Sequence, residues 1–369
     1  MTETEKIHRI AISLFKKINF SNLQEIFNYL NSVEEFFHLD KAILSEIPNV
    51  NSPFLEEYKA QITICLEKAK RELEYIEKNN INIHFFTDET FPKRLLECPD
   101  CPKLIYSKGV ADFNKHKYLG VVGTRKATEY GRNTCFKLIS ELAKSQPKLC
   151  IISGLAYGID IASHKVALES NIPTIGVIGG GYDYFYPKAH YNTSLEMQKK
   201  GAVITEFTHE MHPEPFNFVQ RNRIIAGMSD GVLVVESAAK GGSLITAELA
   251  YSYNRDVMAV PGRTIDAASM GCNSLIKTNK AALVENAKDI ERVMCWEKEN
   301  TRPQSFELFP ILTEKENLIV DIIKEKGTVH VDIISQLSGI KISELSALLL
   351  NLEFNNVIRN IPGNQYMLY

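Results

Sequence analysis

The stretch Gln220–Ala250, QRNRIIAGMSDGVLVVESAAKGGSLITAELA, decides the predicted fold of this chain. Its centre, Gly231–Val235, is a short valine-rich run typical of a buried parallel strand, whereas Leu244–Tyr253 returns to helical spacing. The glycine-containing segment Gly241–Ser243 stands between them, where the second helix would begin. The stretch therefore predicts a helix, a buried strand, a glycine loop and a second helix.

The glycine loop has the features of an anion site. A helix that starts there leaves backbone N–H groups free, directs the positive end of its dipole at a ligand, and allows close approach because glycine has no side chain. Arg221 and Arg223 precede the strand, and an arginine pair near such a loop would make bidentate contacts with a phosphate. The same pattern also fits two arginines that cap a surface helix. The loop therefore predicts a phosphate site and leaves both roles of the arginines open.

Length and composition indicate a chain of several ordinary globular domains. Its 369 residues suggest two or three domains, and 44% hydrophobic with 24% charged residues excludes a disordered chain. No run approaches the ~18 apolar residues of a membrane span, and the start lacks the apolar core of a signal peptide. We therefore expect a cytoplasmic protein. The net charge of −3 does not exclude a local basic groove.

Cysteine and histidine offer two weak candidates for metal or redox sites. The seven Cys are irregularly spaced, which favours reduced thiols over a disulfide framework. Cys98 and Cys101 have C-x-x-C spacing without a second such pair, and His209 and His212 lack a third ligand at suitable spacing. We therefore interpret the cysteines as part of an irregular turn and the histidines as loop residues, and expect no metal.

The order of patterns predicts five parts. Residues 1–79 indicate a small helical domain, of the helix-hairpin-helix-like or sterile-alpha-motif-like kind, and residues 80–111 an extension that docks on a larger sheet. Residues 112–295 repeat a strand, a glycine-bearing turn and a helix, which predicts an α/β fold with a doubly wound, Rossmann-like parallel sheet. Its strands are expected at Tyr118–Val122, Leu149–Ser153, Thr174–Ile178, Ala202–Glu206, Gly231–Val235, Asp256–Val260 and Ala282–Glu285.

The last two parts are a linker, 296–311, and a compact unit, 312–369. The unit is predicted to contain three helices followed by a hairpin, the order of a winged helix. Winged helices often place the third helix in the DNA major groove, but here Ser343–Phe354 contains no Lys or Arg. We therefore favour a protein-contact or accessory role for this domain.

The turns that follow the strands predict where a ligand binds. Gly123-Thr124-Arg125 follows the first strand of the sheet and the SGLAYG segment the second, so small-residue turns converge on the carboxyl edge. None spells G-x-G-x-x-G, and no acidic residue stands where a ribose would need one, so a dinucleotide cofactor is not expected. Basic residues among these turns would suit several successive phosphates: Arg125, Lys126, Lys165, Arg221, Arg223 and Lys240.

With these segments in view, the chain resembles the DNA-processing protein A family, also called DprA or Smf. The resemblance rests on VVGTR, SGLAYGID, YP before His190 and Asn192, RNRIIAG, GGSLITA and a late Pro261-Gly262, all in the family's order. It spans the full length, because the helical start and the winged-helix end resemble domains that members carry. Thr124 replaces the usual Ser, which keeps the hydroxyl.

The resemblance implies a protein that is not an enzyme. It implies a homodimer that binds and protects incoming single-stranded DNA during natural transformation and loads RecA recombinase onto it, without a cofactor and without a membrane. The DNA-binding residues expected from the matched segments and from the placement of charge are Gly123, Thr124, Arg125, Lys126, Ser153, Gly154, Lys165, Arg221, Asn222, Arg223, Lys240, Gly241, Gly242 and Ser243. Tyr157 and Tyr182 are candidate stacking surfaces for bases, with packing as the alternative.

Two other functions fit parts of the sequence. The RNRIIAG to GGSLITAE segment is also similar to nucleotide 5'-monophosphate phosphoribohydrolases, in which Glu248 would be the catalytic carboxylate. Against that activity, Glu236-Ser237 follows the strand where Pro-Gly-Gly is expected. A protein-interaction scaffold is the other alternative.

Overall fold

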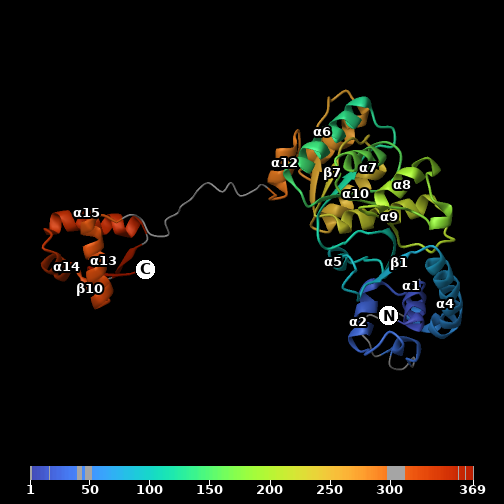
Figure 1. The fold of residues 1–369 in the computed structure, drawn as a ribbon, viewed down its shortest axis with the longest axis horizontal. Helices are drawn as coiled ribbons and strands as arrows, with labels where there is room; N and C mark the ends of the chain where they lie inside the picture. Colours follow the sequence, from blue (N-terminus) through green and yellow to red (C-terminus); the bar gives the residue numbers. More distant parts are fainter. Residues whose placement is uncertain are drawn as a thin grey trace. The chain divides into compact units, whose positions relative to one another are not determined.

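The computed structural model describes residues 2–15, 17–39, 44–45, 52–296, 312–355, 357–361 and 363–368. The chain divides into two compact units, Met1–Glu297 and Lys298–Tyr369, each with its own apolar core (Figure 1). The predicted linker lies outside the described residues, apart from Trp296.

A nine-stranded sheet organises the first unit, in the order β1-β2-β6-β5-β4-β3-β7-β8-β9. The strands from β3 to β9 are parallel, while β1 and β2 extend the sheet in antiparallel fashion beside β6. This confirms the doubly wound α/β class; β1 and β2 belong to the predicted extension, whose limits stay a prediction. The strands are β1 (Asn82–Phe85), β2 (Leu104–Gly109), β3 (Lys117–Val122), β4 (Leu149–Ser153), β5 (Thr174–Val177), β6 (Ala202–Thr205), β7 (Gly231–Val234), β8 (Asp256–Ala259) and β9 (Ala282–Leu283).

Helices cover both faces of the sheet because its central strands are apolar on both sides. In β3, Leu119 and Val121 pack into the core with α6 and α7, whereas Tyr118 and Val122 pack into the core with α9 and α10. Continuous apolar strands are the expected pattern for a parallel sheet buried on both faces. The covering helices are α5 (Lys93–Leu96), α6 (Glu129–Ser145), α7 (Ile159–Glu169), α8 (Tyr191–Gln198), α9 (Pro215–Met228), α10 (Gly242–Ser252), α11 (Met270–Lys277) and α12 (Ala287–Val293), with short turns η2 (Tyr182–Tyr184), η3 (Lys188–His190) and η4 (Ala267–Ser269).

The strand order reverses at β3. The chain adds β4, β5 and β6 on one side of β3, and then returns to place β7 on the other side. In open parallel sheets such a reversal separates the loops on either side of it and opens a crevice at the carboxyl edge. The predicted ligand edge therefore has its deepest point between β3 and β7.

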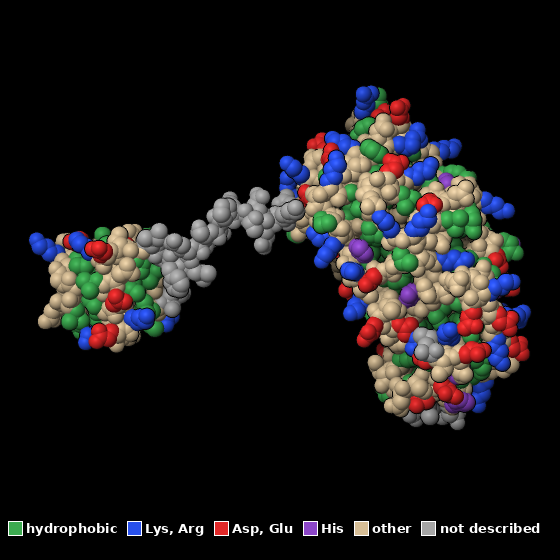
Figure 2. Space-filling model, viewed as in Figure 1, with side chains coloured by type: hydrophobic (Ala, Val, Ile, Leu, Met, Phe, Trp, Pro, Cys, Tyr) green, Lys and Arg blue, Asp and Glu red, His purple; other side chains and the backbone are tan. Residues whose placement is uncertain are grey.

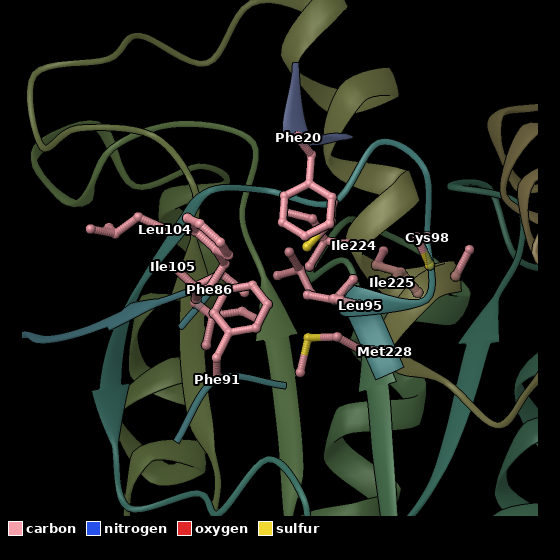
Figure 3. Packing of buried hydrophobic residues seen from close by; sticks show 14 of the residues in the cluster. Phe20, Phe86, Phe91, Leu95, Cys98, Leu104, Ile105, Ile224, Ile225 and Met228 are labelled. Carbon is pink, nitrogen blue, oxygen red and sulfur yellow. The ribbon is translucent and has the colours of Figure 1, made fainter. Parts of the chain in front are cut away.

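The helical start shares its core with the sheet-bearing part. It comprises α1 (Glu3–Ser13), α2 (Phe20–Asn28), η1 (Glu35–Phe37) and the long α4 (Ser52–Lys78). Figure 3 shows Phe20 of α2 close to Leu95 and to Ile224 of α9, with Phe86 beside them, in one buried cluster. The first unit is therefore a single packed body.

The second unit is a winged helix. It contains α13 (Glu314–Lys326), α14 (Val331–Ser338) and α15 (Ile342–Phe354), and a small sheet in the order β10-β12-β11. The predicted hairpin corresponds to β11 (Ile358–Ile361) and β12 (Gln365–Leu368); the two-residue β10 (Val329–His330) was not predicted. The three helices and the sheet enclose a core that includes Ile334, Leu345 and Leu349.

Candidate nucleic-acid interface

A crevice of about 410 Å³ lies at the reversal point of the sheet. The loop after β3 forms one wall, the loop after β7 the opposite wall, and one face of α9 closes it. The predicted DNA-binding residues that line it are Gly123, Thr124, Arg125, Arg221, Asn222, Lys240, Gly241, Gly242 and Ser243. The structure thus brings together segments that are more than a hundred residues apart in the sequence.

Arg125 is exposed on a loop that is held rigidly. The N–H of Thr124 donates to the carbonyl of Glu236 at 2.8 Å, and the buried Glu236 carboxylate accepts from the N–H of Thr128 at 2.9 Å and from its hydroxyl. The Arg125 guanidinium lies over the ring of Phe218, with Cζ 5.4 Å from the ring centroid. Arg125 therefore offers a fixed positive charge beside an aromatic face.

The N-terminus of α10 forms the facing wall. Gly241 caps the helix without a side-chain hydrogen bond to its first turn. Gly242 is exposed, and a Cβ built on it would meet no atom within 4 Å. Ser243 is held in place by its hydroxyl, which donates to Ser237 Oγ at 2.9 Å. These residues present backbone N–H groups and the positive dipole end to the crevice, which suits an anion.

Arg221 lies buried at the floor of the crevice and is not exposed at its surface. Its side chain is buried, and Nη1 donates to the carbonyl of Val177 at 2.6 Å. Burial lowers the pKa of Arg221 to about 10, opposed by the nearby Asp160, while burial raises the pKa of Asp160, opposed by Arg221. A Cβ on Gly154 would stand 1.9 Å from Arg221 Nη1, so only glycine leaves room for this guanidinium. Arg221 and Asp160 therefore form a buried pair that supports the turn after β4.

Arg223 points to a different part of the molecule. Its guanidinium donates to Glu206 and to the carbonyl of Asp100, outside the crevice lining. Residues two apart on a helix point to nearly opposite sides, which explains why Arg221 and Arg223 separate. Arg223 thereby anchors the extension to α9, and its contact with DNA remains a prediction.

The other predicted residues differ in their access to a ligand. Asn222 lines the crevice and its Nδ2 donates to the carbonyl of Gly242 at 3.4 Å, which ties α9 to the glycine loop. Ser153 is buried, and its hydroxyl donates to the carbonyl of Val121. Lys126 and Lys165 are exposed and lie outside the crevice lining. On the face drawn in Figure 2, basic and acidic side chains are interspersed over the first unit.

Among the residues of this region that the sequence did not predict, three have aromatic or charged side chains that bear on ligand binding. Phe218 and Asp160 line the crevice, and Tyr186 lines a small adjoining cavity together with Arg125 and Phe218. Phe218 stands three residues before Arg221 on α9, so helical spacing was the available signal. Tyr157, a predicted stacking residue, also lines the adjoining cavity and is 45% exposed. Tyr182 donates its hydroxyl to the carbonyl of Val203 at 2.8 Å and packs elsewhere.

The weak metal and redox candidates have structural partners. Cys98 and Cys101 are buried free thiols, and burial raises the pKa of Cys98 to about 11. His209 is 2.6 Å from Glu72 Oε2 and stacks on Tyr75. Within the described parts of the chain, no group of three or more His, Cys, Asp or Glu side chains is arranged to hold a metal ion.

Glu248, the carboxylate of the enzymatic alternative, lies outside the crevice lining. It is exposed on α10 and accepts from Lys280 Nζ at 2.7 Å. The carboxylate in the lining is instead Asp160, paired with Arg221. In the portion of the chain that the structure describes, no single helix has the length and hydropathy of a membrane span; the bent pair α14 and α15 reaches them only when counted together.

Comparisons with known proteins agree with this architecture. Residues 82–294 match the family described as DNA recombination-mediator protein A, and residues 309–364 match the DprA winged helix domain. The chain is 35% identical over 289 residues to DNA processing protein DprA of Streptococcus pneumoniae, covering 77% of this chain and 98% of that protein. It is 29% identical over 332 residues to protein Smf of Escherichia coli, covering 88% and 87%.

Two solved structures are similar to the chain. The X-ray structure of DNA processing protein A from Streptococcus pneumoniae has a TM-score of 0.66 at 31% identity and covers 79% of this chain and 98% of that one. A structure of DNA processing protein A from Helicobacter pylori has a TM-score of 0.52 at 28% identity and covers 58% and 97%. The latter structure is described as revealing a single-stranded DNA binding mode of that protein.

Proposed function

The chain belongs to the DNA-processing protein A (DprA/Smf) family, and from this premise we propose that its crevice binds the phosphate backbone of single-stranded DNA. The observation that carries the proposal is the pairing of Arg125 with the N-terminus of α10 across one crevice. The Helicobacter pylori relative, which is described as binding single-stranded DNA, supports the same ligand.

Binding follows from the charges and the shape of the crevice. Arg125 pairs with one phosphate, and the N–H groups at Gly241–Ser243 receive another, with Lys240 adding charge at the rim. The faces of Phe218 and Tyr186 beside Arg125 stack on unpaired bases, which duplex DNA does not offer. The protein therefore prefers single strands and reads little sequence.

Fluorescence anisotropy with a labelled mixed-sequence strand, competed by duplex of equal length over a range of salt, tests the proposal. We expect salt-sensitive binding and weak competition by duplex. Arg125→Ala should lower the affinity for single strands of every sequence by the same factor, because one phosphate contact is lost. For the same reason the affinity of this variant should depend less steeply on salt concentration. Lys144→Ala is the matched control, since Lys144 is exposed in the last turn of α6, away from the crevice.

The proposed contact residues that do not lie at the surface of the crevice could reach DNA only under particular conditions. The DNA contacts proposed for Ser153, Arg221 and Arg223 require that these side chains leave their present partners. The contacts proposed for Lys126 and Lys165 require a strand that runs beyond the crevice lining. Alanine variants of the two lysines that bind short and long strands normally would remove them from the interface.

We further propose that the bound strand is protected and passed to RecA recombinase during natural transformation, in the cytoplasm and without catalysis. The family's role as a recombination mediator supports this step. A homodimer would join two crevices and raise the affinity for long strands. RecA filament assembly on strands coated with single-strand-binding protein should accelerate with the wild type and not with Arg125→Ala. Nucleotide hydrolysis abolished by Glu248→Gln would instead indicate the enzymatic alternative.

A further inference from the structure

A second cavity, of about 550 Å³, lies where the end of α4 meets the sheet-bearing part of the first unit. Four aromatic side chains and two lysines dominate its lining: Tyr75, Lys108, Tyr182, Phe185, Lys188 and Tyr191. They come from α4, β2, the η2 loop and the start of α8. None of these residues belongs to the crevice described above, so the cavity is a separate site in the same packed unit.

Several aromatic faces are fixed by their neighbours. Tyr182 is oriented by its hydroxyl, which donates to the carbonyls of Val203 and Tyr106 at 2.8 and 3.2 Å. Phe185 and Tyr191 pack edge to face with their centroids 5.4 Å apart, and Tyr191 remains 51% exposed. Rings whose orientation is already set lose little conformational entropy when a flat ligand stacks on them.

The charges in the cavity favour a ligand that is flat and anionic. Lys108 Nζ lies 5.0 Å from the centroid of the Tyr182 ring, and Lys188 is exposed at the opening. One carboxylate, Asp183, also lines the cavity and lies 4.0 Å from His209 Nε2. Aromatic faces interleaved with lysines are the arrangement that binds bases and phosphates of single-stranded nucleic acid.

The loop 182–188 connects this cavity with the crevice. Phe185 and Lys188 face the cavity, whereas Tyr186 and Pro187 line the small space beside Arg125 and Phe218. Tyr184, 41% exposed, stands on the same loop, and the Tyr186 and Phe218 rings are 5.8 Å apart between centroids. The 182–188 loop therefore carries aromatic side chains both to the space beside Arg125 and to the second cavity, while the Tyr184 ring packs on His212 with centroids 3.7 Å apart.

We propose that this cavity, formed by Tyr75, Lys108, Tyr182, Phe185, Lys188 and Tyr191, binds further nucleotides of the strand whose phosphates the crevice holds. The inference rests on the proposed function and extends its site to α4 of the helical start. Bases leaving the crevice stack on Tyr186 and Tyr184, and the next base enters the cavity while Lys108 and Lys188 neutralise its phosphates.

The test compares strands that fill one site or both, using the full chain. Labelled oligothymidylates of about 5 and about 15 nucleotides lie near the lower and upper ends of the range of site sizes known for single-strand grooves. The variant Lys188→Ala/Tyr191→Ala changes two exposed side chains and so keeps the fold. It should bind the short strand like the wild type and the long strand about tenfold more weakly, through the loss of one stacked base and one phosphate contact.

Matched variants separate this proposal from the proposed function. Phe136→Ala/Lys137→Ala removes an exposed aromatic and lysine pair from α6 and should leave both affinities unchanged. Arg125→Ala should lower the affinity for both the short and the long strand. If Lys188→Ala/Tyr191→Ala binds the long strand as tightly as the wild type does, the proposal that the second cavity binds nucleotides is overturned and the proposed function is not. If the wild type binds neither strand, the proposed DNA binding by the crevice is overturned as well.

A cross-linking experiment gives an independent readout. A 15-nucleotide strand, a length of about the groove sizes above, carries 5-bromouracil near one end and is irradiated with the wild-type protein. Peptide mapping should place a cross-link within residues 182–191 in addition to one near Phe218. Cross-links restricted to the crevice, with the whole strand protected, would contradict the proposed path.

Discussion

Arg125 and Arg221 show how differently two arginines of one crevice behave. Arg125 is exposed and has no ionic partner that competes with a phosphate among those the structure assigns, whereas Arg221 is buried against Asp160. We predict that Arg125→Ala leaves the free energy of unfolding unchanged and weakens DNA binding. Arg221→Ala should cost about 3–5 kcal/mol of stability, because a buried carboxylate loses its partner. Urea unfolding of both variants measures the difference; equal stabilities would contradict the assignment of Arg221 to the floor.

Two glycines provide a sharper residue-scale comparison. Gly242→Ala adds a methyl group into open space, so stability should stay constant or rise by up to about 1 kcal/mol. The same methyl group stands in the path of a phosphate, and affinity for single strands should fall about tenfold, or about 1.4 kcal/mol. Gly154→Ala should instead lower the melting temperature, because its Cβ would overlap Arg221. Normal DNA binding by Gly242→Ala would show that the strand does not approach the α10 amides.

The pH dependence of stability tests the buried histidine under the sheet. Burial lowers the pKa of His164 to about 3 from an ordinary value of 6.5. A depressed pKa in the folded state means that the stability is complete above pH 6.5 and is lost as pH falls toward 3, which amounts to about 2 kcal/mol by pH 5. Urea unfolding at pH 7 and pH 5 measures this loss. His164→Gln should flatten the slope, whereas His38→Gln, which changes an exposed histidine, should not.

At the scale of elements, the sequence predicts the positions of the repeated strands, but it does not predict which way the side chains of a helix point. The parallel strands were recognisable because each is a short apolar run followed by a glycine-bearing turn, and their observed ends lie within about two residues of the expected ones. The partners of Arg221 and Arg223 were not recognisable from the run of letters RNR, because they depend on which face of α9 meets the sheet. The five domain limits stay a prediction.

The winged helix yields a prediction for an element as a unit. The exposed surface of α15 carries no Lys or Arg. Ser343, Ala347, Leu350 and Phe354 are uncharged, and the exposed Glu344 is acidic. A helix without positive charge gains little affinity for DNA from contacts with its phosphates. We therefore expect a chain that ends after Trp296 to bind single strands as the full chain does, since the crevice lies wholly in the first unit. Anisotropy compares the two, and a large loss on truncation would assign DNA contacts to the winged helix.

For the whole molecule, the informative feature is that α9 contributes residues both to the crevice and to the core shared with the helical start. Phe218 and Arg221 on one face build the crevice, while Ile224 and Met228 join the core that contains Phe20 and Leu95 (Figure 3). Changes in the helical start are therefore expected to affect the packing of α9. Phe20→Ala should cost about 3–5 kcal/mol of stability, the usual penalty for a buried phenylalanine, and unfold the first unit in a single transition. Calorimetry with two resolved transitions for the first unit would contradict this shared core.

The same shared core has a consequence for the newborn chain. Phe20, Phe86 and Phe91 leave the ribosome long before Ile224 and Met228, their packing partners on α9. The interval is roughly 130 to 200 residues, or about 7–40 s of translation at typical bacterial rates. Throughout that time the apolar surface formed by these three side chains lacks its cover from α9 and is accessible to chaperones.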